Sequence, residues 1–368
     1  MRIGILTLPF NNNYGGYLQA YALMTVLKQM GHHVELIYRR PKKRPLRYRL
    51  MNPFKTFVKI LLGMPHGGFI MNQENDLRRS GRLLMPFVDQ NITPKTIPFY
   101  TTTRMKKFCE GKYDAIIVGS DQVWRPKYVP NIYDFFLEFV DDKNVKKIAY
   151  AASFGTFTPE YTKEQKEKCG KLISEFQAIS VRETSGLEVI EKFGWKTKCI
   201  PQLVLDPTFL LPQKVYLKHI RKTSLEQIFC YVLDDSEQTK EIISRAEKIL
   251  QLPTYEILKE INAKSFTLPS IETWLSSIYN ARFVLTDSFH GMVFSIIFNK
   301  PFAVYVNQAR GADRFVSLLH LIGLENRMIN DISDIDNIVK APIKWEKVNE
   351  KLEKMKNHSI HYLKESLS

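Results

Sequence analysis

His290 is the side chain in this sequence whose chemistry and position best suit proton transfer. The apolar run Phe283–Thr286 predicts a buried strand and an apolar segment from Met292 predicts a helix, so His290 falls at the junction between them. Ligands bind α/β sheets at the carboxyl ends of the strands, and the histidine side chain titrates near neutral pH. Ser288 is a polar neighbour at this edge, and Gly291 leaves space beside the imidazole. The alternative is a structural histidine, the commoner use of an isolated His.

A glycine-containing loop, Asn11–Gly16, follows the first apolar run and precedes the first helical segment. Gly15 and Gly16 allow a ligand to approach backbone N–H groups at the start of that helix. Turns of the same composition also occur where nothing binds. The loop therefore predicts either a binding site or a plain strand-to-helix turn.

A third candidate, Gly119–Trp124, combines small polar residues, a carboxylate and an indole directly after the apolar run Ala115–Val118. Asp121 can orient a hydroxyl group or act as a base, and Trp124 can stack on a sugar ring. In the alternative interpretation, Ser120 and Asp121 cap the next helix and Trp124 lies in the core.

Three arginines follow apolar runs and can bind an anion there. Arg182 follows the run that ends at Val181, and Arg310 and Arg314 follow the run that ends at Val306. A guanidinium group can grip a carboxylate or phosphate with two hydrogen bonds. The alternatives are a salt bridge for Arg182 and a solvated loop for Arg310 and Arg314.

The hydrophobic pattern predicts an α/β scaffold for these candidates. Short runs rich in Ile, Val, Phe and Tyr do not alternate with polar residues, which is typical of parallel strands buried on both faces. These runs are Ile3–Leu8, Val34–Tyr38, Ala115–Val118, Ile148–Ala152, Ala178–Val181, Ile228–Leu233, Phe283–Thr286 and Phe302–Val306. Helical segments such as 17–30, 163–176 and 237–250 lie between many of them.

A chain of 368 residues corresponds to about two domains. We predict an N-terminal α/β domain over 1–206, a proline-containing linker over 207–227 and a C-terminal α/β domain over 228–342. A helix over 343–368 ends the chain. The ordinary globular composition excludes a disordered or fibrous protein.

The positive charge is large and unevenly spread. The chain has 53 basic and 38 acidic residues, a formal net charge of +15, which indicates an anionic partner. Nine of the basic residues lie in 39–59 without an acid, and apolar residues continue at helical spacing to 62. The segment 39–62 predicts either a basic amphipathic helix on an anionic membrane or a helix packed on its own domain.

Compartment and cofactors follow from what the sequence lacks. The four cysteines have neither disulfide-framework nor zinc spacing. No apolar run has the length of a membrane span, and the N-terminal run is interrupted by Gly4 and Pro9. We expect a cytoplasmic protein, soluble or peripheral on the inner face of the membrane, that requires no metal and no cofactor.

Taken together, these segments resemble the polysaccharide pyruvyl transferase family. The likeness extends over nearly the whole chain, in the family's order, and is carried by N-Y-G-G-Y-L-Q-A-Y-A-L at 13–23, V-G-S-D-Q-V-W at 118–124, S-V-R-E at 180–183, L-D-P-T at 205–208, T-D-S-F-H-G at 286–291 and R-G-A-D-R-F at 310–315. The resemblance implies two Rossmann-like domains facing a cleft, as in glycosyltransferases of the B architecture. It also implies transfer of pyruvate from phosphoenolpyruvate to two hydroxyls of a sugar, forming a cyclic ketal in a surface polysaccharide or its precursor.

The resemblance and the chemistry of the residues together assign roles to the candidates. By resemblance, His290 matches the family's essential histidine and Arg182 its conserved arginine. His290 is the expected general acid, and Asp121 is a second expected catalytic residue. The expected donor-binding residues are Arg182 in the N-terminal domain and Ser288, Gly291, Arg310 and Arg314 in the C-terminal domain. The expected acceptor-binding residues in the N-terminal domain are Asn13, Tyr14, Gly15, Gly16, Gln19, Ser120 and Trp124.

One departure from the family pattern concerns the donor. Some members carry Arg-Leu before the histidine, where this chain has Ser288-Phe289. Either Arg310 and Arg314 supply the missing cation, or the donor differs.

Two other classes of function stay open at this point. The same architecture can use a nucleotide-sugar donor, as glycosyltransferases do. Besides these two transferase functions, the third possibility is a nucleic-acid-binding or membrane-binding module without catalytic activity. We find no nucleic-acid motif and expect no nucleic-acid partner, whereas the basic segment fits a lipid-linked sugar acceptor on an anionic membrane.

Overall fold

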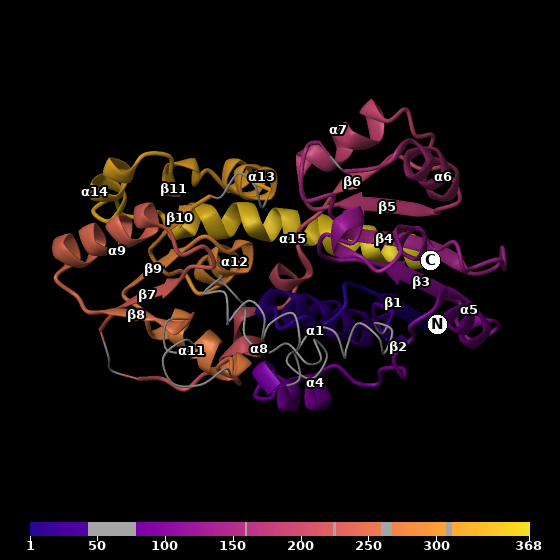
Figure 1. Ribbon diagram of the computed structural model, residues 1–368, viewed down its shortest axis with the longest axis horizontal. Coiled ribbons are helices and arrows are strands. Elements are labelled where there is room, and N and C mark those ends of the chain that lie inside the picture. The colour runs from indigo at the N-terminus through magenta and orange to yellow at the C-terminus, as the bar shows by residue number, and fades with distance from the viewer. Residues whose placement is uncertain (43–78, 159, 224–225, 259–266, 307–310) are drawn as a thin grey trace, which may run out of the picture.

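The chain folds into two α/β domains, each built on one sheet in which every strand pair is parallel (Figure 1). The computed structural model describes residues 1–42, 79–158, 160–223, 226–258, 267–306 and 311–368. The predicted fold class is confirmed. The strands of the first sheet all precede residue 204, and those of the second all follow residue 227.

The first sheet has the strand order β2-β1-β3-β4-β5-β6. Ile3 and Ile5 of β1 face a core shared with α1, whereas Leu6 faces a second core shared with α5 and α6. Because helices cover both faces, the strands have no polar alternation. The elements of this domain are β1 (Arg2–Leu6), α1 (Tyr14–Gln29), β2 (His33–Ile37), α4 (Met85–Asn91), α5 (Thr102–Cys109), β3 (Ala115–Val118), β4 (Lys146–Ala152), α6 (Lys163–Ile173), β5 (Ala178–Val181), α7 (Thr184–Lys192) and β6 (Gln202–Leu203).

The second sheet has the strand order β11-β10-β9-β7-β8. Its central helix, α12, is apolar around nearly its whole circumference because it packs on β9 and β10 on one side and on α1 of the first domain on another. The elements are β7 (Ile228–Tyr231), α9 (Glu237–Leu250), β8 (Thr254–Glu256), α11 (Ile271–Asn280), β9 (Phe283–Thr286), α12 (Phe289–Ile297), β10 (Phe302–Tyr305), α13 (Asp313–Ile322), β11 (Met328–Ile329) and α14 (Ile335–Ile338).

The first half of the connection between the domains is packed rather than exposed. It begins with a 3₁₀ turn, η3 (Pro207–Phe209), and continues into the short helix α8 (Gln213–Leu217). Phe209 and Tyr216 are buried in the core that also contains α1. The predicted linker therefore contributes to the interface between the domains.

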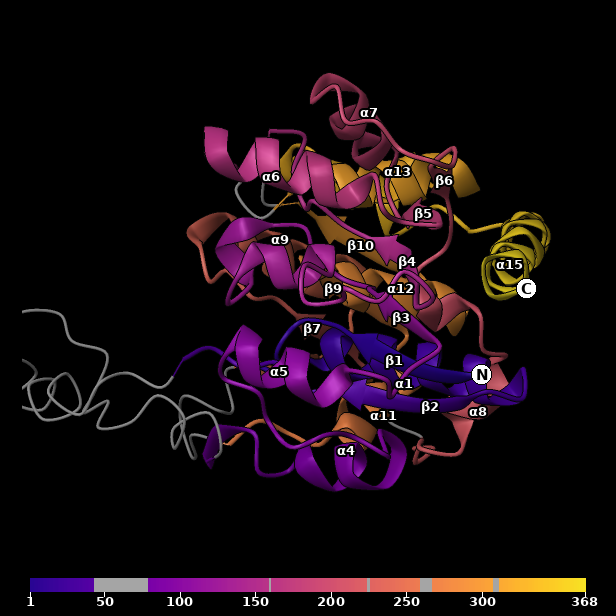
Figure 2. The ribbon, with the colours of Figure 1, turned by 90° about the vertical axis from the view of Figure 1, so that its right-hand side faces the viewer.

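The C-terminal helix α15 (Trp345–Leu367) runs along one side of the molecule from the second domain to the first (Figures 1 and 2). It contacts α13 in the second domain and β4 in the first. Tyr362 Oη donates to the carbonyl of Ala149 at 2.8 Å, and Ser359 Oγ accepts from the N–H of Leu205 at 3.0 Å. Helix α15 thus packs on both domains, and its C-terminal end lies on the first domain.

The predicted strands are present, with ends shifted by up to two residues. The strands that the hydrophobic pattern does not predict are β6, β8 and β11. Each has only two or three residues, too few to form an apolar run.

The basic segment 39–62 lies mostly outside the described residues, which include only 39–42 of it. Arg39 does not face a membrane: its Nε donates to Oδ2 of Asp134 at 2.7 Å, and both side chains are buried. Arg39 is therefore part of the first domain and is not available to a membrane surface, whereas both alternatives for the rest of the segment concern residues outside the described ranges. Within the described ranges, no helix has the length and apolar character needed to cross a bilayer.

Candidate active site

His290 lies in the first turn of α12, at the interface between the two domains. β9 ends at Thr286, and Ser288 caps α12 by accepting a hydrogen bond from the N–H of Gly291 at 3.4 Å. The imidazole is 5% exposed because it packs on Gly15 in the first turn of α1. A Cβ built on Gly15 would lie 1.9 Å from Nδ1 of His290. The glycine loop and the histidine predicted from separate motifs therefore meet.

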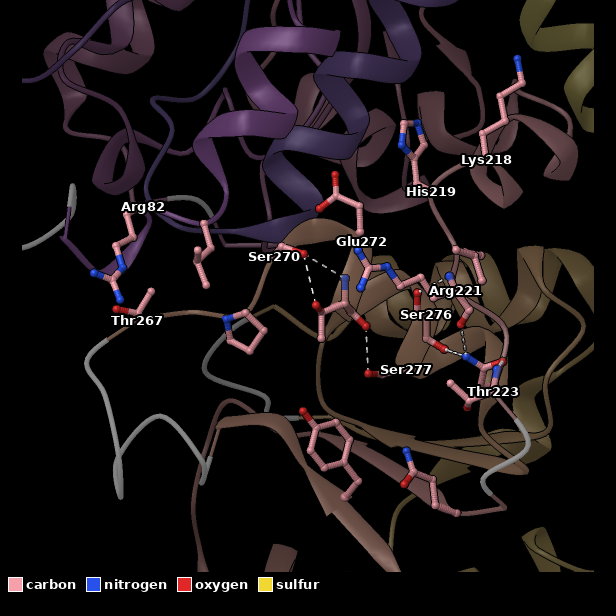
Figure 3. Close-up of a pocket in the computed structure, with 17 residues that line it drawn as sticks. Arg82, Lys218, His219, Arg221, Thr223, Thr267, Ser270, Glu272, Ser276 and Ser277 are labelled. Carbon is pink, nitrogen blue, oxygen red and sulfur yellow. Dashed lines mark hydrogen bonds between the residues drawn. The ribbon is translucent and has the colours of Figure 1, made fainter.

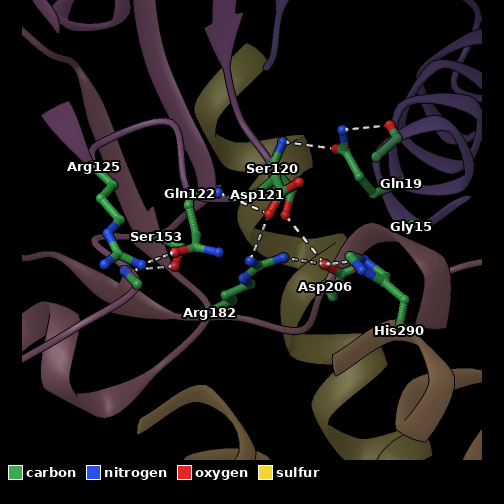
Figure 4. A network of polar contacts seen from close by, with 12 residues as sticks. Gly15, Gln19, Ser120, Asp121, Gln122, Arg125, Ser153, Arg182, Asp206 and His290 are labelled. Carbon is green, nitrogen blue, oxygen red and sulfur yellow. Dashed lines mark hydrogen bonds and ion pairs between the residues drawn. The ribbon is translucent and has the colours of Figure 1, made fainter. Parts of the chain in front are cut away.

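A chain of buried charged groups extends from His290 into the first domain (Figure 4). Nε2 of His290 lies 3.6 Å from Oδ2 of Asp206. Arg182 then bridges two carboxylates, donating from Nη1 to Oδ2 of Asp206 and from Nη2 to Oδ1 of Asp121, both at 2.9 Å. Its Nε lies 3.7 Å from Glu183. All these side chains are nearly or fully buried.

The buried charges shift one another's titration. Burial alone would raise the pKa of Asp206, but the interaction with His290 and the charge of Arg182 hold that pKa well below its usual range. Burial likewise opposes ionisation of Asp121, yet the charges of Arg182, His290 and Arg314 lower its pKa. The pKa of Glu183 is raised because burial outweighs the attraction of Arg182. Asp121 and Asp206 are thus held as carboxylates.

Arg314 is a cation of this site that forms no ion pair with any of the described residues. Its Cζ lies 5.3 Å from the centroid of the Phe289 ring, and Cζ of Arg182 lies 4.8 Å from the same centroid. Nε of Arg314 is buried without a hydrogen-bond partner, and among the described residues the side chain forms no ion pair. Burial and the neighbouring Arg182 lower the pKa of Arg314 to about 10. An anionic ligand would satisfy this group.

A pocket of about 320 Å³ opens at the carboxyl ends of β1 and β3. Asn13 and Gly16 line it on either side of Gly15, which contacts His290. Its other lining residues include a carboxylate, a cation and two aromatic rings: Asp121, Lys127, Phe10 and Tyr128. The pocket has the mixture of ring surfaces and hydrogen-bonding groups that suits a sugar.

A larger hollow of about 1140 Å³ lies on the polar face of α11 (Figure 3). Exposed cations such as Arg82, Lys218 and Arg221 line it. None of the residues in the predicted site lines this hollow, so it is separate from the candidate active site.

Four predicted acceptor contacts are wrong because the side chains are buried and already bonded. Trp124 is fully buried, stacks on Phe136, and donates from Nε1 to a backbone carbonyl. Gln19 Nε2 donates to the hydroxyl of Thr7, and Gln19 Oε1 accepts from the N–H of Ser120. The Ser120 side chain is itself fully buried.

Tyr14 is the fourth of these. Its hydroxyl donates to the carbonyl of Pro269 at 2.8 Å, and its ring stacks on Trp274. These residues hold the loops and the two domains together. Of the predicted acceptor residues, Asn13 and Gly16 line the pocket and Gly15 contacts the histidine.

The predicted donor contacts also need correction. Arg182 cannot grip a donor in this arrangement, because both Nη atoms already bond carboxylates. Ser288 acts as a helix cap, and a Cβ on Gly291 would lie 2.4 Å from Oγ1 of Thr286, so this glycine serves close packing. Arg310 lies outside the described residues. Arg314 is the predicted donor residue that remains available.

The sequence interpretation did not single out Asp206, Glu183 or Phe289 as site residues. Asp206 and Glu183 both stand close after a strand, within segments quoted above for the family likeness. For Glu183, an acid close after the buried strand β5 was the signal that could have identified it, whereas β6, before Asp206, is too short to give such a signal. No group of three or more His, Cys, Asp or Glu side chains in the described ranges has an arrangement that could hold a metal ion.

The fold is the two-domain α/β architecture of B-type glycosyltransferases and related sugar-nucleotide enzymes. The chain is similar to UDP-GlcNAc 2-epimerase from Methanocaldococcus jannaschii, with 8% identity, 94% of this chain and 93% of that chain covered, and a TM-score of 0.52. It is also similar to UDP-GlcNAc 2-epimerase from Neisseria meningitidis bound to UDP-GlcNAc, with 10% identity, coverage of 100% and 99%, and a TM-score of 0.50. At these identities the likeness shows the fold alone.

The chain belongs to the polysaccharide pyruvyl transferase family, whose model matches residues 13–308. The match covers most of the chain and includes the glycine loop, the charged network and the histidine, so the protein is a transferase. No curated protein matches the chain significantly.

Proposed function

We propose that this protein transfers pyruvate from phosphoenolpyruvate to two hydroxyls of a sugar acceptor, forming a cyclic ketal. The family supports a pyruvyl transferase. The observation that carries the choice of donor is Arg314, a partly buried guanidinium without an anionic partner among the described residues, on the Phe289 ring beside His290. Phosphoenolpyruvate brings a carboxylate and a phosphate, and either can bond this guanidinium.

The acceptor fits the pocket of about 320 Å³ between the loops after β1 and β3. Asp121 can accept a hydrogen bond from a sugar hydroxyl there, while Phe10 and Tyr128 offer ring surfaces. The acceptor hydroxyls then lie on the Gly15 side of His290, where the two domains meet.

The reaction needs one proton at carbon and two carbon–oxygen bonds. Protonated His290 gives its proton to the methylene carbon of phosphoenolpyruvate, which becomes the methyl group and leaves cationic character at the adjacent carbon. One sugar hydroxyl attacks that carbon and returns its proton to His290. The second hydroxyl then attacks as the carbon–oxygen bond to phosphate breaks, and its proton leaves with inorganic phosphate.

Thermal unfolding with separate ligands tests this proposal. A ligand that binds only the folded chain stabilises it by about 2.7 kcal/mol at a hundredfold excess over its Kd. We expect a larger rise in Tm with phosphoenolpyruvate than with phosphate, UDP or GDP, and loss of that rise in Arg314→Ala. A rise with UDP or GDP and none with phosphoenolpyruvate would instead establish a nucleotide-sugar donor.

A further inference from the structure

The two carboxylate oxygens of Asp206 serve different parts of the molecule. Oδ1 accepts from the N–H and the hydroxyl of Thr208 at 3.1 and 2.8 Å, which caps the first turn of the connection between the domains. Oδ2 faces the buried network, accepts from Arg182 at 2.9 Å, and is the atom that lies 3.6 Å from Nε2 of His290.

Nε2 of His290 needs such a partner. The atom is buried and has no hydrogen bond within 3.5 Å, and a buried nitrogen left unbonded is costly. Oδ2 of Asp206, 3.6 Å away, is a carboxylate oxygen that can accept a proton from this nitrogen. Catalytic hydrogen bonds are often long without substrate and shorten in the complex. The neighbouring Arg182 holds the Asp206 carboxylate in place by donating to the same oxygen, Oδ2.

We propose that Asp206 is the positioning residue for His290, holding the proton of the neutral imidazole on Nε2 and directing Nδ1 to the substrate. Nδ1 is the nitrogen nearest Gly15, in the turn whose flanking residues Asn13 and Gly16 line the pocket. This inference rests on the proposed role of His290 in pyruvyl transfer.

The arrangement also couples the histidine to the seam between the domains. His290 is carried by the second domain, whereas Asp206 begins the connection and is tied to Arg182 of the first. The pair is therefore complete only when α12 lies against α1. A separation of the domains would remove Nε2 from its acceptor and leave the imidazole without a fixed tautomer.

Asp206→Asn tests the inference because the amide keeps the size of the side chain but loses its charge. The amide presents either a neutral carbonyl or an N–H to Nε2, so the preference for a proton on Nε2 disappears. Loss of the carboxylate that orients a catalytic histidine lowers kcat by roughly 10²–10⁴-fold. We expect such a fall for pyruvyl transfer, with the KM for phosphoenolpyruvate changed far less. Thr208→Val is the matched control, since it removes a bond to Oδ1 alone, and we expect a lower Tm with kcat within about threefold of wild type.

The ¹⁵N NMR spectrum of labelled histidine gives a readout independent of turnover, with the His290 signals assigned by their absence in His290→Gln. We expect neutral His290 to carry its proton on Nε2 in the wild type and to lose this preference in Asp206→Asn. An unchanged kcat or an unchanged tautomer in Asp206→Asn would overturn the inference, while pyruvyl transfer by the wild type would still support the proposed function. If the wild type transfers no pyruvate, the proposed function fails, and an unaltered Nε2 tautomer in Asp206→Asn would still refute the pairing.

Discussion

The imidazole of His290 packs directly on Gly15, so that a Cβ at residue 15 would lie 1.9 Å from Nδ1 and 2.1 Å from Cγ. One residue opens the first helix of the first domain, and the other stands in the first turn of the central helix of the second. The contact requires a residue without a side chain at position 15. It brings the histidine against the turn whose residues Asn13 and Gly16 line the pocket between the loops after β1 and β3.

Gly15→Ala should therefore inactivate the enzyme more than it unfolds it. The new methyl group cannot share space with the imidazole, so His290 must move, and a displacement of about 1 Å at a reacting group costs roughly a hundredfold in rate. Gly16→Ala is the steric comparison, because its Cβ would lie 3.7 Å from the nearest atom, an ordinary contact. Since Gly16 lines the pocket, the two variants are compared by kcat at saturating acceptor. Measuring the steady-state rate with phosphoenolpyruvate and the Tm of both variants checks this prediction. Equal activity in both would show that the contact has no role.

We expect substitution of Arg182 to lower the stability of the fold more than it weakens donor binding. Its guanidinium is 1% exposed and bonds two buried carboxylates, so Arg182→Met leaves Asp121 and Asp206 uncompensated. Breaking a buried ion pair on one side costs about 3–5 kcal/mol. Urea unfolding should show that loss, whereas Arg2→Met, which breaks an exposed pair with Asp114, should change little. A stable Arg182→Met variant with only a raised KM would restore Arg182 as a direct donor contact.

Substitution of Arg314 should instead weaken donor binding more than it lowers the stability of the fold. Since the side chain forms no ion pair in the part of the chain that the structure describes, Arg314→Ala leaves no carboxylate there without a direct partner. A hydrogen bond to a charged group is worth about 1.5–3 kcal/mol, roughly 10- to 150-fold in Kd. We expect calorimetry to show phosphoenolpyruvate binding weaker by that factor, with Arg314→Lys in between. Unchanged binding in Arg314→Ala would place the donor elsewhere.

The network predicts a specific loss of stability in acid. The pKa of Asp121 is lowered in the folded chain, because nearby cations outweigh burial. Such a group stabilises the fold above its unfolded pKa of about 3.9, and the contribution is lost as the pH falls through the folded pKa. The free energy of unfolding should therefore drop below about pH 4, and Asp121→Asn should show a shallower drop. A drop of the same slope in both proteins would mean that Asp121 is not held as a carboxylate by this network.

Much of the scaffold is local and could be predicted from sequence. The runs that form β3, β5 and β9 are apolar throughout because both faces of each sheet are covered, and such a pattern needs no knowledge of the neighbours. The same reasoning places His290 after β9 and the glycine loop after β1, each at the carboxyl edge of its own parallel sheet, where ligands bind. The segments that resemble the polysaccharide pyruvyl transferase family also indicated the class of reaction.

The roles of individual side chains depended on contacts between distant parts of the chain. Trp124 and Arg182 carry the same chemistry whether they face a ligand or a protein partner, and only the tertiary structure places one in the core and the other between Asp121 and Asp206. Burial decides this difference, because a buried indole or guanidinium must find its partners inside the protein. Sequence alone indicated the strand ends at which the candidate site lies. The packing of α12 on α1 decided which side chains meet there, since that contact joins two domains that no local pattern relates.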